Sequence, residues 1–571
     1  MKAIHTFIFL ILSLFSFSQQ VTRSEMLGRP TDKSILIRMF FDESVEVSVE
    51  YGTQKGNYTL KTPWSYVDAA TASNILLNDL LADTRYYYRV LYRRPGNTNF
   101  ITRPEYTFHT RRNKGSSFTF VIQADPHLDQ QSDTAVYNRC LQNQLEDNPD
   151  FMIDLGDIIM TDKLKNSEGK ITRDTIKKRC EYLRSFYEEI CHSVPLYMTL
   201  GNHEGEAGWT LNGNSENTAV WSTLERKKYF SNPIPDAFYT GDDTDHDFVG
   251  QRENYYSWTW GDALFIVLDP YWYTKPKPDG ETGWRWTLGK KQYDWLRFVL
   301  ENDQSLYKFV FCHQLIGGDP NGRGGIEFSD WYEWGGFNKD GSYGFSDNRP
   351  GWYKPVKDLL KENRVDIFFH GHDHFFGKQE KDCLIYQECP QPSHKNFTNA
   401  NQAAEYGYVS GQILPNSGHL RIQVNEEEVK VEYVRAYSAA NETPARKNKD
   451  IAATYFVRPV NCYDSLATGL PVIWNSLYTN ELIYPNPSDD QTNISFTLHR
   501  PERISIEIAD LTGNHVKTLV DDNLIPEGKY EIIWDGRNEK GQKVQAGNYI
   551  YVIRSGPVRL STGQITRIQS H

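Results

Sequence analysis

The sequence predicts a multidomain chain in which a central α/β domain is flanked by two small β-sandwiches. The first observation is the length of 571 residues, which exceeds the roughly 50–250 residues of one domain. The second is a change near residue 117, where strand-like alternation gives way to short apolar strands separated by helical segments. The third is the return of strand-like alternation after residue 481.

The first 18 residues have the order of a secretory signal peptide. Lys2 precedes an apolar run, Ile4–Phe17, and the small residues Ser16 and Ser18 stand at its end. A membrane anchor is the alternative, but the run is shorter than the roughly 20 apolar residues that span a bilayer. We therefore expect removal of residues 1–18 and a mature protein that is secreted or attached to the cell surface.

Residues 19–112 form the first predicted sandwich. The segments Ile35–Phe41, Val45–Tyr51 and Arg85–Arg93 place β-branched or aromatic residues at every second position, as strands do. The run Leu80–Val90 resembles the corner and following strand of a fibronectin type III domain.

Residues 117–437 form the predicted α/β domain, and residues 438–480 are interpreted as a connector with some packing. The apolar strands of the domain are Phe118–Ala124, Phe151–Leu155, Leu196–Leu200, Ala263–Leu268, Phe309–Cys312 and Val365–Phe369. Helical stretches between these strands predict layers of helices and sheet.

Five of the six strands are followed by side chains that bind metals. The motifs are Asp125-Pro126-His127, Gly156-Asp157 with Asp154 two residues earlier, Gly201-Asn202-His203-Glu204, His313 and Gly371-His372-Asp373-His374. Carboxylate, amide and imidazole ligands suit manganese, zinc and iron. In Asp-X-His and His-X-His, alternation along an extended chain puts both side chains on one side. One carboxylate can bridge two ions about 3.5–4 Å apart, so the set predicts a dinuclear metal site.

The five motifs resemble those of the calcineurin-like metallophosphoesterase superfamily, across about residues 117–437. The resemblance implies a four-layer fold, with two β-sheets packed face to face and helices outside. It also implies one ion held by Asp125, His127, Asp157 and His374, and a second held by Asp157, Asn202, His313 and His372. His203 would contact the phosphate, and it would stabilise developing charge or protonate the leaving oxygen. Asp154 and Glu204 are candidates to orient the histidines from behind.

The N-terminal sandwich narrows the resemblance to purple acid phosphatases, but two positions depart from that family. The purple colour of that family requires a tyrosine three residues after the aspartate that bridges the ions. This chain has Met160 at that position. The family also lacks a histidine at the position of His127. We therefore expect no ferric–tyrosinate site and two divalent ions, iron, manganese or zinc.

The resemblance implies an enzyme that hydrolyses a small phosphate mono- or diester through attack by a hydroxide that bridges the ions. Arg323, in a glycine-rich segment after His313, is a candidate to bind the phosphate or a sugar, and a solvated loop is its alternative. A catalytically idle surface binding or adhesion protein and a nucleotidase or nuclease remain open as other functions. The net charge of −12 and the lack of a long Lys/Arg run argue against a standing nucleic-acid partner.

Residues 481–571 form the second predicted sandwich. Its opening Tyr484-Pro485-Asn486-Pro487 and its Trp534-Asp535-Gly536 resemble the Ig-like C-terminal sorting domain of the type IX secretion pathway and the domain of hook-capping proteins. The resemblance implies the outer-membrane secretion machinery as a partner. A structural or carbohydrate-binding sandwich is the alternative.

The chain has seven cysteines, an odd count that leaves at least one thiol unpaired. Cys383 and Cys389 are close enough in sequence to form a disulfide across a loop, which export would favour. Cys312 lies in an apolar run and is expected in the core.

Overall fold

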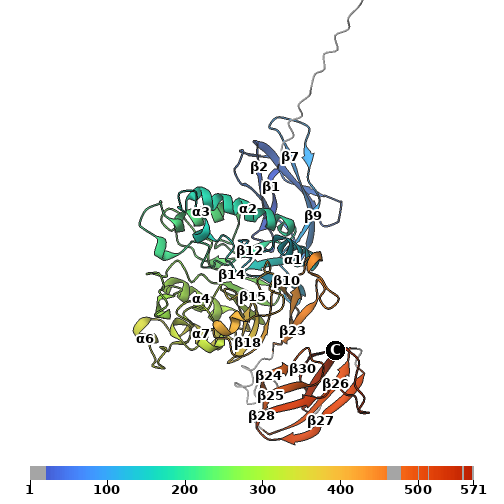
Figure 1. Cartoon of the computed structure of the whole chain (residues 1–571). Helices are drawn as coiled ribbons and strands as arrows, with labels where there is room; N and C mark the ends of the chain where they lie inside the picture. The colour runs from blue at the N-terminus through green and yellow to red at the C-terminus, as the bar shows by residue number, and fades with distance from the viewer. Residues whose placement is uncertain (1–20, 460–477, 499–500, 512–513, 556–557, 569–571) are drawn as a thin grey trace, which may run out of the picture. The chain divides into compact units, whose positions relative to one another are not determined.

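The structure, a computed structural model, describes residues 21–459, 478–498, 501–511, 514–555 and 558–568 (Figure 1). It divides into two compact units, Met1–Arg111 with Arg184–Pro195, and Arg112–Leu183 with Leu196–His571. The predicted signal peptide, residues 1–18, lies outside the described residues. Within the described ranges, no helix combines the length and the apolar character needed to cross a membrane.

The N-terminal domain is a β-sandwich, as predicted. One sheet has the order β1 (Val21–Gly28), β2 (Ile35–Phe41) and β6 (Ser73–Leu77). The other pairs β3 (Val45–Gly52) with β7 (Arg85–Arg93), and β4 (Leu60–Lys61), β5 (Ser65–Val67), β8 (Ile101–Thr102) and β9 (Tyr106–His109) flank this pair. The Tyr86 hydroxyl accepts a 2.9 Å hydrogen bond from the backbone N–H of Leu81 and so fixes the corner before β7.

The central domain contains two large sheets. The six-stranded sheet has the order β12 (Leu196–Met198), β11 (Phe151–Asp154), β10 (Phe118–Gln123), β21 (Gly418–Val424), β22 (Val429–Arg435) and β23 (Ile451–Val457). The eight-stranded sheet has the order β13 (Thr240–Gly241), β14 (Tyr256–Trp260), β15 (Ala263–Val267), β16 (Tyr307–Phe311), β17 (Ile367–His370), β19 (Leu384–Glu388), β18 (Phe376–Lys381) and β20 (Gln412–Leu414).

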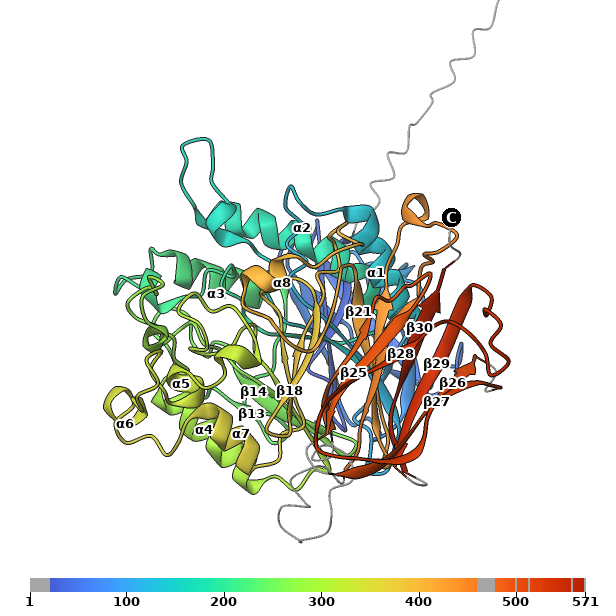
Figure 2. The same ribbon diagram turned by 60° about the horizontal axis from the view of Figure 1, so that its bottom comes forward.

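Both faces of the eight-stranded sheet are buried at β15, β16 and β17, which explains the continuous apolar sequences of these strands. Phe265 of β15 belongs to the aromatic core shared with the six-stranded sheet, where it meets Phe120 of β10 edge-on at 5.2 Å between ring centroids. Leu264 and Ile266 point the other way, into a second core. That second core includes residues of α4 (Lys290–Asn302) and α7 (Val356–Glu362), which lie together with α5 (Tyr332–Gly335) on one side of the domain (Figure 2).

Five α-helices remain among the described residues. They are α1 (Thr134–Glu146), α2 (Arg173–Cys191), α3 (Thr218–Tyr229), α6 (Phe345–Asn348) and α8 (Gln402–Glu405). Helix α1 packs against β21 of the six-stranded sheet. The N-terminus of α1 is capped by the Asp133 carboxylate, which accepts from the backbone N–H groups of Ala135 and Val136. The two sheets with helices outside give the predicted layered α/β fold.

The central sheet extends further along the chain than its predicted end at residue 437. Strand β23 lies inside the stretch interpreted as a connector, yet it pairs antiparallel with β22 along most of its length. The Tyr455 hydroxyl also donates a 2.9 Å hydrogen bond to the Gln387 side chain of β19. The strand was missed because its sequence, with Ala452 and Ala453 near the start, has a weak alternation of large apolar residues. The rest of the predicted connector, from 460 to 477, lies outside the described residues.

The C-terminal domain is the second predicted β-sandwich. One sheet has the order β24 (Tyr478–Tyr484), β25 (Thr492–Leu498) and β28 (Gly528–Trp534), and the other has the order β27 (His515–Ile525), β26 (Glu502–Asp510), β29 (Gly547–Ser555) and β30 (Val558–Arg567). The Trp534 ring is fully buried against Tyr549, and its N–H donates to the Arg537 carbonyl at 3.0 Å. The Trp-Asp-Gly motif is therefore the start of a turn tied down by a core residue.

The proposed pairing of Cys383 with Cys389 is wrong. Cys389 follows β19 directly and is a free thiol buried in the core between the two large sheets. Cys383, in the tight turn between β18 and β19, is disulfide-bonded. Cys312 is a free, buried thiol in the second core, as expected.

Candidate metal centre

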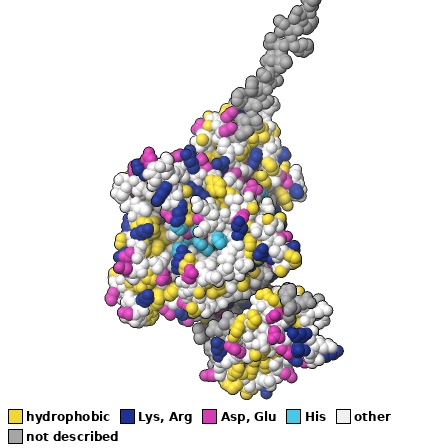
Figure 3. Space-filling model, in the orientation of Figure 1, with side chains coloured by type: hydrophobic (Ala, Val, Ile, Leu, Met, Phe, Trp, Pro, Cys, Tyr) yellow, Lys and Arg dark blue, Asp and Glu magenta, His cyan; other side chains and the backbone are white. Residues whose placement is uncertain are grey.

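Each metal-binding motif directly follows a strand of one of the two large sheets. Within each sheet, the carboxyl ends of these strands lie at one edge. Strands β10, β11 and β12 run parallel, and so do β16 and β17. The loops after these five strands carry Asp125, Asp157, Asn202, His313 and His372. Figure 3 shows histidine side chains together at the surface on one face of the central domain.

The predicted ligands fall into two groups. Ligand atoms of Asp125, His127 and His374 lie within 4.8 Å of one another, and so do those of Asp157, His313 and His372. The Asn202 amide oxygen lies 3.1 Å from His313 Nε2, beside the second group. The Asp157 carboxylate oxygen Oδ2 lies 3.7 Å from His127 Nε2 and 3.2 Å from His313 Nε2, so Asp157 stands between the groups. All seven predicted ligands are thus brought together.

The chemistry of these side chains fits two divalent ions. Asp125 Oδ1 and His127 Nε2 are buried and have no hydrogen-bond partner in the described part of the chain. His313 Nδ1 donates to the Leu155 carbonyl at 2.8 Å, which leaves the lone pair of Nε2 pointing at the centre. That Nε2 lies 3.2 Å from His372 Nδ1, and a cation placed there would satisfy both nitrogens.

The carboxylates make the centre strongly attractive to cations. Burial alone would lower the pKa of His127 and His313, but Asp125 and Asp157 outweigh it and raise these pKa values to about 10 and about 9. Burial would raise the pKa of Asp125 and Asp157, yet the adjacent histidines hold both pKa values well below their ordinary range. Both carboxylates therefore stay ionised at neutral pH.

The ligand loops adopt a backbone conformation that costs energy. Asp125, His127, Asp157, His372 and His374 all have positive φ, between 49° and 77°, in the left-handed region that side chains disfavour. Such conformations cluster at functional sites, where the surroundings hold them in place.

Two glycines of the ligand motifs, Gly201 and Gly371, permit the close approach of these loops. A Cβ on Gly201 would lie 2.5 Å from the backbone nitrogen of Asp157, and a Cβ on Gly371 would lie 2.5 Å from Asp125 Oδ2. Contacts this short do not occur in folded proteins, so any larger residue would displace the aspartates.

Glu204 and Asp154, which were expected to orient histidines, accept hydrogen bonds from the backbone of the ligand loops. The buried Glu204 carboxylate accepts hydrogen bonds from the N–H groups of Asp157, Ile158, Ile159 and Gly201. Asp154 accepts from the N–H of Gly156 at 2.9 Å. Both carboxylates therefore fix the turn that presents Asp157.

Arg179 of α2 is a supporting residue that the sequence did not reveal. Its guanidinium donates to the carbonyls of His127 and Leu128 in the first ligand loop. It also donates to the carbonyls of Ile158 and Ile159 in the second ligand loop. One cation thus joins the two loops that carry Asp125 and Asp157.

His203 lies beside the metal ligands and has a carboxylate partner. Its Nε2 is 4.0 Å from Asp157 Oδ2, and its Nδ1 is 2.5 Å from Asp162 Oδ1. Burial lowers the pKa of His203, but Asp157 and Asp162 raise it by more, so the net shift is upward. The pKa of Asp162 is lowered in turn, so its carboxylate is ionised and accepts a hydrogen bond from Nδ1–H of His203. In the protonated form that the raised pKa of His203 favours, Nε2–H faces the metal ligands. Asp162 was not singled out from the sequence.

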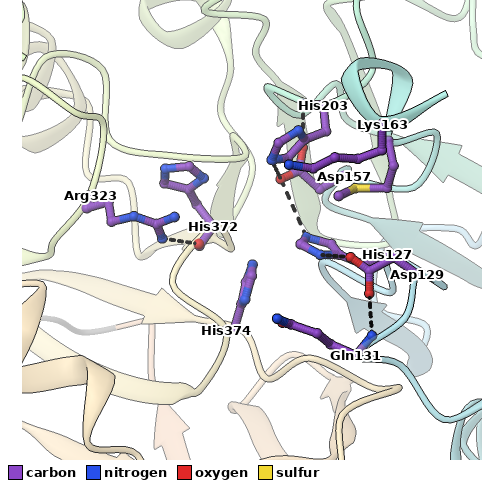
Figure 4. Close-up of a pocket in the computed structure, with 10 residues that line it drawn as sticks. His127, Asp129, Gln131, Asp157, Lys163, His203, Arg323, His372 and His374 are labelled. Carbon is purple, nitrogen blue, oxygen red and sulfur yellow. Dashed lines mark hydrogen bonds and ion pairs between the residues drawn. The ribbon is translucent and has the colours of Figure 1, made fainter. Parts of the chain in front are cut away.

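Several of the predicted ligands line a pocket of about 200 Å³ (Figure 4). Arg323 lines it, as its candidate role requires, and Lys163 lines it as well, which was not predicted. The other lining residues are His127, Asp129, Gln131, Asp157, Met160, His203, His372 and His374. Pockets for drug-sized ligands measure roughly 300–1,000 Å³, so this one suits a small polar group with the rest of a molecule outside.

Comparison with known proteins agrees with this architecture. The sequence model of the family Calcineurin-like phosphoesterase matches residues 118–376, and that of the FlgD Ig-like domain matches residues 483–555. The purple acid phosphatase PPD1 from yellow lupin (Lupinus luteus) seeds is similar in structure, with a TM-score of 0.51 and 16% identity over 76% of this chain and 74% of that one. PhoD is similar with a TM-score of 0.53 and 14% identity, over 76% of this chain and 88% of that one. No curated protein gives a significant sequence match.

The fold and the site thus define a metallophosphoesterase domain in the centre of the chain. This domain is of the calcineurin-like phosphoesterase type, and the chain also contains a FlgD Ig-like domain near its C-terminus. The likeness to the two solved structures, at 16% and 14% identity, establishes the fold alone.

Proposed function

We propose that the protein is an exported hydrolase that cleaves a phosphate ester with the help of two divalent ions, iron, manganese or zinc. The observation that supports this most is the convergence of seven ligand side chains from five loops directly beside His203. A catalytically idle binding protein would not need to retain this complete set in a strained backbone.

Two divalent ions, when bound, supply an activated water and neutralise charge on the phosphate oxygens. The chain's own residues orient the reaction. Asp157 stands between the two groups of ligands. Protonated His203 presents Nε2–H to the pocket, while its Nδ1–H donates to Asp162. We infer that His203 passes this proton to the oxygen of the leaving group.

A substrate panel tests the hydrolase. Purified protein is assayed on aryl phosphate mono- and diesters with manganese, zinc or iron, and each activity is repeated with a chelator. We expect hydrolysis of at least one class and its loss with the chelator. Hydrolysis that persists after removal of all metal would contradict the proposal.

A variant test assigns His203. His203→Ala is expected to lower kcat by about 10²–10⁴-fold, the usual contribution of a general acid, while two ions per chain are retained. The matched control is His515→Ala, because His515 is an exposed histidine of the C-terminal domain. Normal turnover in His203→Ala would refute the assignment.

We further propose that residues 1–18 direct export and that the C-terminal domain engages the outer-membrane secretion machinery, so that the protein is released or kept at the cell surface. The Tyr-Pro-Asn-Pro opening supports the sorting role, and the match to the FlgD Ig-like domain supports an Ig-like module. Deletion of residues 481–571 in a host with type IX secretion should trap the protein inside the outer membrane. Undiminished release of the shortened chain would refute this part.

A further inference from the structure

Two cations stand at the pocket in addition to any bound metal. Arg323 and Lys163 both line the pocket and reach it from different loops, and Figure 4 shows their side chains on opposite sides of the histidine cluster. Arg323 follows Gly322 in the segment after β16, whereas Lys163 ends the turn Thr161–Lys163 after β11. The pocket is therefore flanked by positive charge on two sides.

The Arg323 guanidinium is held in one orientation. It lies over the Tyr406 ring, 4.3 Å from the centroid, and its Nη1 donates to the His372 carbonyl at 2.6 Å and to Asp373 Oδ1 at 2.9 Å. Among the described residues, Nε and Nη2 have no hydrogen-bond partner, and the side chain remains 31% exposed. A cation fixed in this way loses little freedom when its remaining donors bind an anion.

Lys163 stands on the side of His203. Its ammonium lies 3.3 Å from Asp162 Oδ2, the same carboxylate that accepts from His203 Nδ1. The turn that carries it is tied to the histidine loop, because Thr161 N–H donates to the His203 carbonyl at 2.7 Å. The side chain is 58% exposed, so the ammonium keeps donors for a ligand in the pocket.

We propose that this pair of cations makes the site selective for phosphomonoester dianions over diesters, a proposal that rests on the hydrolase function. A monoester carries nearly two negative charges at neutral pH, because its second pKa is about 6, and it has three free oxygens. A diester carries one charge and two free oxygens, and its second substituent needs space in a pocket of about 200 Å³. Arg323 binds one free oxygen through a forked, charge-assisted contact, and Lys163 adds charge beside the leaving group.

The test compares kcat/KM for an aryl phosphate and for the corresponding bis(aryl) phosphate, which share one leaving group. We expect the wild-type protein to prefer the monoester. Arg323→Ala should lower kcat/KM for the monoester about 10- to 100-fold, the value of one or two charged hydrogen bonds, and lower that for the diester much less. Lys163→Ala should act in the same direction, more weakly because Lys163 is more exposed.

Matched controls and a binding readout separate selectivity from structural damage. Arg297→Ala and Lys170→Ala remove exposed cations elsewhere in the same domain and should leave both activities unchanged. The inhibition constant of inorganic phosphate should rise in Arg323→Ala while the metal content stays at the wild-type value. Arg323→Lys, which keeps the charge without the fork, should fall between the wild type and Arg323→Ala.

Three results would overturn the inference. The first is a wild-type preference for the diester. The second is an equal loss of both activities in Arg323→Ala, and the third is a loss of metal in that variant. Either of the last two would indicate that Arg323 only holds the His372 carbonyl. The proposed hydrolase would survive each of them. It fails separately, if the metal-loaded wild-type protein hydrolyses neither ester.

Discussion

Replacement of Arg179 tests whether the two ligand loops depend on a single cation. Its guanidinium donates to four backbone carbonyls, two in each loop. Arg179→Lys keeps the charge but loses the planar fork, so one ammonium cannot reach all four carbonyls. Both loops contain residues with positive φ, a conformation that persists only when its surroundings enforce it.

The expected loss follows from these contacts. A hydrogen bond from a charged donor contributes about 1.5–3 kcal/mol. In the variants water can bind some of the carbonyls that Arg179 leaves, so the net cost of the substitution is closer to one such hydrogen bond than to four. This corresponds to about 10- to 100-fold in metal affinity, which is also the usual effect of removing a group that supports metal ligands. Arg179→Ala should reach the upper part of this range, and Arg179→Lys the lower part.

The assay is metal content by mass spectrometry after dialysis against graded chelator, with circular dichroism to confirm folding. Lys178→Ala is the matched control, because Lys178 is the preceding residue of α2 and pairs on the surface with Asp174. If folded Arg179→Ala retains two ions at the same chelator concentration as the wild type, the loops hold their shape without this contact and the reasoning is wrong.

Three further predictions use the same centre. Asp162→Asn should lower kcat about tenfold or more. It should also shift the pH profile of His203 to lower pH, because a charge that raises the pKa of His203 is lost. An unchanged profile in steady-state kinetics would count against the pairing of His203 with Asp162. Gly201→Ala should abolish binding of the ion expected at Asp157, His313 and His372, because the added Cβ would clash with the Asp157 loop. Titration calorimetry measures this binding, and a normal titration would show that the loop can move. In metal-free protein the raised pKa values of His127 and His313 stabilise the fold fully below about pH 6.5, and this contribution disappears as the pH rises through about 9 to 10. The free energy of unfolding in urea should fall over this pH range without metal and should not fall with metal. Parallel pH dependences with and without metal would contradict this prediction.

The strands and the site motifs were predictable because both obey local rules. Predicted strands such as Ile35–Phe41 and Phe118–Ala124 match observed strands closely, since burial of apolar residues leaves a readable periodicity. Each ligand motif follows an apolar strand, and parallel strands bring their carboxyl ends to one edge. The convergence of Asp125, Asp157 and His372 could therefore be inferred without knowledge of the connections.

The supporting residues could not be predicted, because their roles depend on tertiary placement. Arg179 sits in a charged helical segment where an arginine is ordinarily solvated, and only the packing of α2 brings it to the loops. Asp162 and Lys163 follow the second motif in an irregular turn with no periodicity. The cysteine prediction failed for a related reason: closeness in sequence does not show that Cys389 points into a core.

The last strand of the six-stranded sheet determines where the chain can be shortened. A fragment that stops at residue 437 would lack β23, and the N–H and C=O groups of β22 would lie bare along an outer edge. Such an edge recruits strands from other copies, so this fragment should form aggregates even though every ligand is present. A recombinant form of the central α/β domain intended for crystallisation should therefore end after Val457.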